Sequence, residues 1–152
     1  MTCRFPTRWS TIAIATFLAA SSTSAARADL MSACKVDIAN LCSGVPDGRG
    51  RISACLFSHS SKLDAACRSE VNVVAQQSQS NWLLPNSVRS LMGGGFPPTV
   101  PAACAADTDQ VCSGADTGQR AILACLYAHT RTVSTACATE IDAALKQQLH
   151  PA

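Results

Sequence analysis

The feature that most constrains this chain is a four-cysteine pattern that occurs twice with the same spacing, C-x7-C-x12-C-x11-C. A shift of 70 residues places the first set on the second: Cys34, Cys42, Cys55 and Cys67 on Cys104, Cys112, Cys125 and Cys137. Self-similarity at a fixed distance is the sequence sign of a repeated structural unit. Four cysteines in register, with other identical residues around them, cannot be dismissed as chance. The sequence therefore predicts one small fold present in two copies.

Each copy is predicted to contain about three short helices. Apolar residues recur at helical spacing over 30–42, 52–59 and 67–75, and again in the second copy. Gly44 stands where a glycine commonly ends a helix, and Asp64 and Ser134 are favourable N-caps for the third helix. Strand patterns are nearly absent. The expected fold class is all-α, with two tandem disulfide-stapled helical repeats.

The remaining segments divide the chain into four parts. These are a signal peptide over 1–28, a first repeat over 29–84, a Gly/Pro-rich linker over 85–100 and a second repeat over 101–149. The linker contains Gly93–Gly95 together with Pro97 and Pro98, a composition typical of flexible or extended connections. Trp82, Leu83 and Leu84 precede it, and we expect them to cover the end of the first repeat in preference to forming a partner-binding patch.

The N-terminal segment has the parts of a secretory signal. Arg4 and Arg8 precede a short apolar stretch over 12–20, and Ala26-Arg27-Ala28 is an A-x-A cleavage site. The apolar stretch is too short to span a bilayer, although an uncleaved anchor is the alternative interpretation. Residues 31–34 also match a lipobox loosely, but the apolar stretch ends well before Cys34. We expect a periplasmic or secreted protein with no stable membrane span after cleavage.

Removal of the signal changes the charge of the chain. The full sequence has 12 basic and 10 acidic residues, and Arg4, Arg8 and Arg27 lie in the predicted signal. The mature balance is therefore 9 − 10 = −1. Without a basic stripe to neutralise phosphates, nucleic acid is not an expected partner.

The cysteines are predicted to form disulfides. One of the nine, Cys3, leaves with the signal, and an even number in an exported chain indicates a disulfide framework. A unit of this size buries too little apolar surface to fold securely alone, and each bond would contribute about 3 kcal/mol.

Four cysteines allow three pairings per copy, and the helix geometry favours one of them. Cys42 ends the first helix and Cys55 lies early in the second, so the turn between the helices brings them together. Cys34 lies about 12 Å back along the first helix, and Cys67 returns to that level if the chain breaks at the Asp64 cap. We expect nested bonds: Cys34–Cys67, Cys42–Cys55, Cys104–Cys137 and Cys112–Cys125.

The quoted residues resemble a known family. The pattern C-x2-D-x3-L-C-S-G, then G-R-I-x2-C-L-x2-H, then L-x3-C is similar to the cysteine-rich repeat of the Golgi cysteine-rich sialoglycoprotein, or cysteine-rich fibroblast growth factor receptor, family. Small exported bacterial proteins with a few such repeats look similar. The resemblance covers 34–71 and 104–141 and implies disulfide-rich helical repeats in a secretory or surface setting. The growth-factor binding and the glycans of the large animal members do not transfer, because this chain has only two repeats and no N-x-[ST] sequon.

His59 and His129 are the side chains that most invite a chemical role. The rise per residue along the first two helices places Asp37 at about the same height as His59. No nucleophilic side chain stands at a matching position beside this pair. We therefore expect structural histidines, hydrogen-bonded to Asp37 or to a loop carbonyl. Thiolate metal sites usually use CxxC or CxxxC spacing, which the mature chain lacks. We therefore predict no catalytic residues, no metal and no cofactor.

The expected function is that of a non-enzymatic binding or structural module with an unknown protein or glycan partner. Loops on a rigid scaffold are common recognition sites, and the turn after the first helix differs between the copies. This makes Arg49 and Arg51 the candidates for binding. The alternative is a periplasmic metal- or redox-handling protein that uses the cysteines with His59 and His129.

Overall fold

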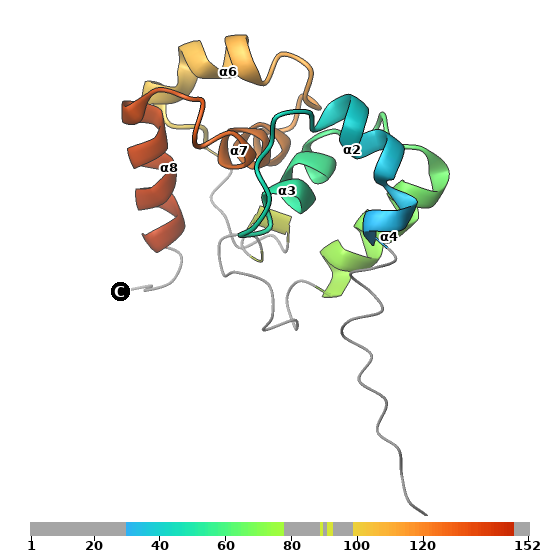
Figure 1. Ribbon diagram of the computed structural model, residues 1–152. Helices are drawn as coiled ribbons and strands as arrows, with labels where there is room; N and C mark the ends of the chain where they lie inside the picture. The colour runs from blue at the N-terminus through green and yellow to red at the C-terminus, as the bar shows by residue number, and fades with distance from the viewer. Residues whose placement is uncertain (1–29, 78–88, 90, 93–98, 148–152) are drawn as a thin grey trace, which may run out of the picture.

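The protein is described by a computed structural model over residues 30–77, 89, 91–92 and 99–147 (Figure 1). The predicted signal peptide, Trp82–Leu84, Gly93–Gly95, Pro97 and Pro98 lie outside these residues. The first repeat contains α2 (Lys35–Leu41), α3 (Arg51–Ser58) and α4 (Ala65–Gln77). The second contains the 3-10 turn η1 (Ala102–Cys104), α6 (Ala105–Val111), α7 (Gln119–Ala128) and α8 (Thr135–Gln147). The described residues contain no strand, which confirms the all-α class.

The ends of the helices follow from local chemistry in both repeats. The Asp64 carboxylate accepts a hydrogen bond from the Cys67 N–H at 2.8 Å, and the Ser134 hydroxyl accepts one from the Cys137 N–H at 3.2 Å. Each bond satisfies one of the backbone donors that the start of a helix leaves unpaired. Both predicted N-caps are thereby confirmed.

The turns between the first two helices of each repeat differ in backbone conformation. In the first repeat Gly44, Gly48 and Gly50 all have positive φ, and Arg49 has φ 54°. Among the described residues of the second repeat, no positive φ occurs, so Gly114 does not repeat the conformation of Gly44. The left-handed glycine expected after the first helix is therefore a property of the first repeat only.

The two repeats pack on each other through their second helices. The contact of α3 with α7 is the most extensive between described elements, and Figure 1 shows this pair at the centre, with α2 and α4 on one side and α6 and α8 on the other. Leu56 of α3 and Leu126 of α7 are both fully buried, and one apolar cluster contains residues of both repeats. The molecule thus has one core shared by two repeats.

Part of the predicted linker also belongs to this core. Leu91 and Met92 are buried and join the same cluster as Leu56 and Leu126. The glycines and prolines around them gave no indication of this, because composition reports backbone freedom and not where an apolar side chain packs. Among the described residues, no helix has the length and apolar character needed to cross a bilayer.

Candidate binding cleft between the repeats

The eight described cysteines form four disulfides, two in each repeat. The bonds are Cys34–Cys67, Cys42–Cys55, Cys104–Cys137 and Cys112–Cys125, the pairs that helix geometry favours. All eight side chains are buried. In the described part of the chain, no group of three or more His, Cys, Asp or Glu side chains could hold a metal ion. The cysteines here act as covalent links between helices.

The aspartate shared by the two repeats connects the first helix to the start of the third. The Asp37 carboxylate accepts a hydrogen bond from the Asp64 N–H at 3.3 Å. The Asp107 carboxylate accepts two from Ser134, one from its N–H at 2.8 Å and one from its hydroxyl at 2.7 Å. Asp37 therefore contacts the N-cap of α4, and the described bonds do not include the Asp37–His59 couple that helical levels suggested.

His59 lies at the end of α3, against the second repeat. Its side chain is only 8% exposed, and its Cε1 lies 3.7 Å from the position that a Cβ at Gly114 would occupy. Burial lowers the pKa of His59 below its ordinary value of 6.5, and Lys62 lowers it further, while the Gly114 carbonyl and Asp116 oppose the shift. Its Nδ1 is buried without a hydrogen-bond partner among the described residues. The imidazole is thus a neutral group packed between the repeats at neutral pH.

His129 occupies the equivalent place at the end of α7 and is less completely buried. Burial lowers the pKa of His129, and the charge of His59 lowers it further. Neither histidine lies in a described metal-binding group. Their positions fit a structural role. Among the described residues, no hydrogen bond joins either imidazole to a nucleophilic side chain.

One contact between the repeats, which we name the closed junction, joins residues 58–62 to residues 114–116. The Asp116 N–H donates to the Ser58 carbonyl at 2.8 Å, and the Ser61 N–H donates to the Asp116 carboxylate at 3.0 Å. The Ser61 hydroxyl also donates to that carboxylate, and the Lys62 ammonium donates to the Gly114 carbonyl. The segment after α3 is therefore fastened directly to the turn before α7.

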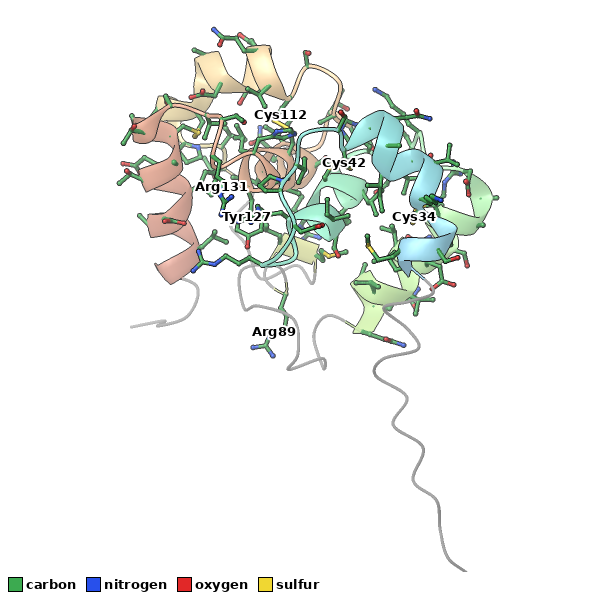
Figure 2. All side chains as sticks on the ribbon, in the orientation of Figure 1. Cys34, Cys42, Arg89, Cys112, Tyr127 and Arg131 are labelled. Carbon is green, nitrogen blue, oxygen red and sulfur yellow. A yellow bond between two sulfur atoms is a disulfide. The ribbon has the colours of Figure 1, made fainter. Side chains whose placement is uncertain are left out.

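A second contact, the open junction, brings the turn before α3 opposite the segment after α7. A polar cleft of about 370 Å³ lies here. Its lining residues are Asp47, Gly48, Arg49, Arg51, Thr130, Arg131, Ala138 and Asp142. Figure 2 shows Arg131 and Tyr127 beside the turn that leads into α3. The cleft is lined by residues of both repeats.

The two arginines predicted as binding candidates have different surroundings in this cleft. Arg51 is buried, and its guanidinium donates to the carbonyls of Pro46 at 3.0 Å and Asp47 at 2.7 Å. It therefore holds the turn in shape. Arg49 is exposed, and its carbonyl accepts a hydrogen bond from the Tyr127 hydroxyl at 2.6 Å. Only Arg49 of the pair keeps its charged group available to a ligand.

Sequence reasoning missed Arg131 and Asp142, which also line the cleft. They lie more than 80 residues from Arg49, and only the packing of α3 on α7 brings them near it. One available signal was the difference between the copies, since the shift of 70 places Arg131 on Ser61 and Asp142 on Asn72. Differences between the copies outside the turn thus also mark residues that line the cleft.

Comparison with known proteins supports the repeat assignment. A family model described as a cysteine-rich repeat, of the cysteine-rich fibroblast growth factor receptor type, matches residues 25–64. No curated protein and no solved structure matched the chain. The matched segment contains Cys34, Cys42 and Cys55, which recur at the same spacing in the second copy. Over these residues the first repeat of this chain is therefore similar to the cysteine-rich repeat family.

Proposed function

We propose that the protein is an exported, non-enzymatic binding module whose partner contacts the open junction. The family and the disulfides support a structural or binding module in general terms. The single observation that carries the more specific proposal is the polar cleft, which combines residues of both repeats on a scaffold held by four disulfides. Preorganised surfaces of this kind lose little conformational entropy on binding.

Export is supported by the signal-like N-terminal sequence and by cysteine pairing, which requires an oxidising compartment. We expect cleavage after Ala28. N-terminal sequencing of the mature protein should give Asp29 or a residue within a few positions of it. A chain that retains Met1, or one with a diacylglyceryl group on Cys34, would contradict this part of the proposal.

Partner binding can be tested by affinity capture from the envelope and medium of the source cell. The oxidised protein should retain a partner that the reduced and alkylated protein does not, because the cleft exists only in the folded state. Quantitative mass spectrometry of the two eluates provides the measurement. Equal capture by both forms would indicate adhesion to unfolded chain, and would contradict the proposal.

A periplasmic metal- or redox-handling function is the second candidate, and titration of thiols separates it from the first. A disulfide scaffold should show no free thiol in the native protein, whereas a thiolate metal site should show several. Stoichiometric metal uptake that is lost in His59→Ala with the fold intact would favour the second candidate.

A further inference from the structure

The two junctions between the repeats differ although equivalent positions form them. The shift of 70 places Asp116 of the closed junction on Pro46 of the open one, and Ser61 on Arg131. Asp116 supplies both the carboxylate that accepts from Ser61 and the N–H that donates to Ser58. Proline has neither group. The hydrogen bonds that Asp116 makes in the closed junction therefore cannot form at the open junction, where a cleft remains.

The cleft presents two guanidinium groups that form no ion pair within the described part of the chain. Arg49 and Arg131 are exposed, one from each repeat, and the structure shows no ion pair between either of them and another described residue. Asp47 and Asp142, which share the cleft, are likewise not ion-paired within the described chain. A guanidinium is a planar fork of donors that matches a carboxylate in two parallel hydrogen bonds. The unpaired arginines thus have the chemistry of a carboxylate-binding site.

The backbone that carries Arg49 is held in an uncommon conformation. Its φ of 54° is left-handed, which costs a non-glycine residue about 1–2 kcal/mol. Gln119, at the equivalent position, begins α7 and has no such conformation. The hydroxyl of Tyr127, from the other repeat, donates to the Arg49 carbonyl. Strain of this kind persists where the surroundings enforce it, and it is concentrated at ligand-binding sites.

We propose that the open junction binds an acidic side chain of a partner protein between Arg49 and Arg131. This inference rests on the proposed binding function and names its ligand chemistry. The lining carries three arginines and two aspartates, a formal charge of 3 − 2 = +1, which suits one carboxylate. A uniformly anionic polysaccharide would bring repeated negative charge against Asp47 and Asp142. A protein segment in which a basic residue neighbours the acidic one meets both kinds of charge.

The test uses the oxidised protein, labelled with nitrogen-15, and two pools of blocked hexapeptides. Every peptide of the first pool contains one Glu next to a Lys, and the second pool replaces that Glu by Gln. The first pool should shift the amide signals of residues 47–51 and 130–131, and should bind about tenfold more tightly than the second, because a charged bidentate contact is lost with the carboxylate. Equal binding of the pools, or no shift at these residues, overturns the proposal.

Variants locate the effect. Arg49→Gln and Arg131→Gln should each weaken binding of the Glu pool by about tenfold. Arg120→Gln is the matched control, because Arg120 is exposed, lies outside the cleft and loses the same charge, so its affinity should be unchanged. Equal losses in all three variants would reduce the effect to net charge and overturn the site. Tighter binding of a sulfated polysaccharide than of the Glu pool would overturn the choice of ligand.

The same variants separate this inference from the proposed function. If a captured partner binds Arg49→Gln and Arg131→Gln as well as the original protein, the molecule is a binding module whose partner needs no carboxylate contact with these arginines, and only the present inference fails. If the oxidised protein captures no partner and the Glu pool does not bind, both proposals fail.

Discussion

At the scale of single residues, the carboxylates of Asp37 and Asp107 show how one side chain fixes the arrangement of a repeat. Each lies on the first helix and accepts a hydrogen bond from the residue that caps the third. The two pairs have the same separation of 27 residues. The sequence showed that these aspartates are shared by the copies, and it offered Asp37 as one of two possible partners of His59, because helical levels give the height of a side chain and not its direction.

Replacement of Asp107 by alanine should lower the free energy of unfolding by about 1–2 kcal/mol. The change removes two hydrogen bonds from a charged acceptor to Ser134 and leaves the start of α8 without its anchor. Urea denaturation of the oxidised protein measures the effect. Asp109→Ala is the control, because Asp109 is exposed on the same helix and loses the same charge. A similar loss in both variants would attribute the effect to charge and not to the anchor.

The stability of the protein should decrease as the pH falls below about 6.5. Burial lowers the pKa of His59 and of His129 in the folded state, while the unfolded chain keeps the ordinary value of 6.5. The unfolded state therefore binds more protons in the window between the lowered values and 6.5, and stability is full above this window and is lost as pH falls through it. Urea midpoints between pH 7.5 and 5 give the measurement. His59→Gln should flatten the profile, and an unchanged slope would show that His59 does not cause it.

At the scale of elements, the features that could be predicted from the sequence are those set by residues near one another in the chain. The cysteine spacing gave the two repeats, while local apolar periodicity and residue type gave the helices, the cap residues Asp64 and Ser134 and the break before the third helix, because each depends on residues close together in the chain. The pairing of α3 with α7 was not predicted, since contacts between distant segments leave no spacing to read. A signal was nevertheless present: residues 121–128, A-I-L-A-C-L-Y-A, are apolar around the whole circumference of a helix, as expected of a helix that is covered on all sides.

The two disulfides of a repeat should contribute unequally to stability. Cys34–Cys67 closes a separation of 33 residues and Cys42–Cys55 one of 13, which corresponds to about 4 and about 3 kcal/mol in the chain-entropy account. Paired replacement by alanine, Cys34 with Cys67 or Cys42 with Cys55, followed by urea denaturation, compares them. All four side chains are similarly buried, so the packing losses should match. A larger loss from the Cys42–Cys55 pair would contradict the loop-length argument.

At the scale of the whole molecule, the shared core makes the two repeats one packed unit. Each disulfide stays within one repeat, yet the apolar cluster crosses from one repeat to the other. No disulfide among these four joins one repeat to the other, but the apolar side chains of the two repeats pack together. We therefore expect unfolding to be one cooperative transition and not two independent ones.

Leu56→Ala tests this cooperativity. Leu56 is fully buried in α3 at the shared core, so its truncation should cost about 2–5 kcal/mol. Hydrogen exchange should become faster in α7 and α8 as well as in the first repeat. Faster exchange confined to residues 30–77, with the second repeat unchanged, would show that the repeats unfold separately.

The reciprocal packing of α3 and α7 has a consequence for symmetry. Two identical repeats that met in this way as separate chains would form a two-fold symmetric dimer, in which every residue at one junction reappears at the other. Such a pair could not fasten one junction with Asp116 and Ser61 and leave the other open. Fusion of both copies into one polypeptide lifts that restriction, because each junction is then encoded by its own residues. The closed junction can hold the two repeats together, while the residues of the open junction are free to change and to bind a partner.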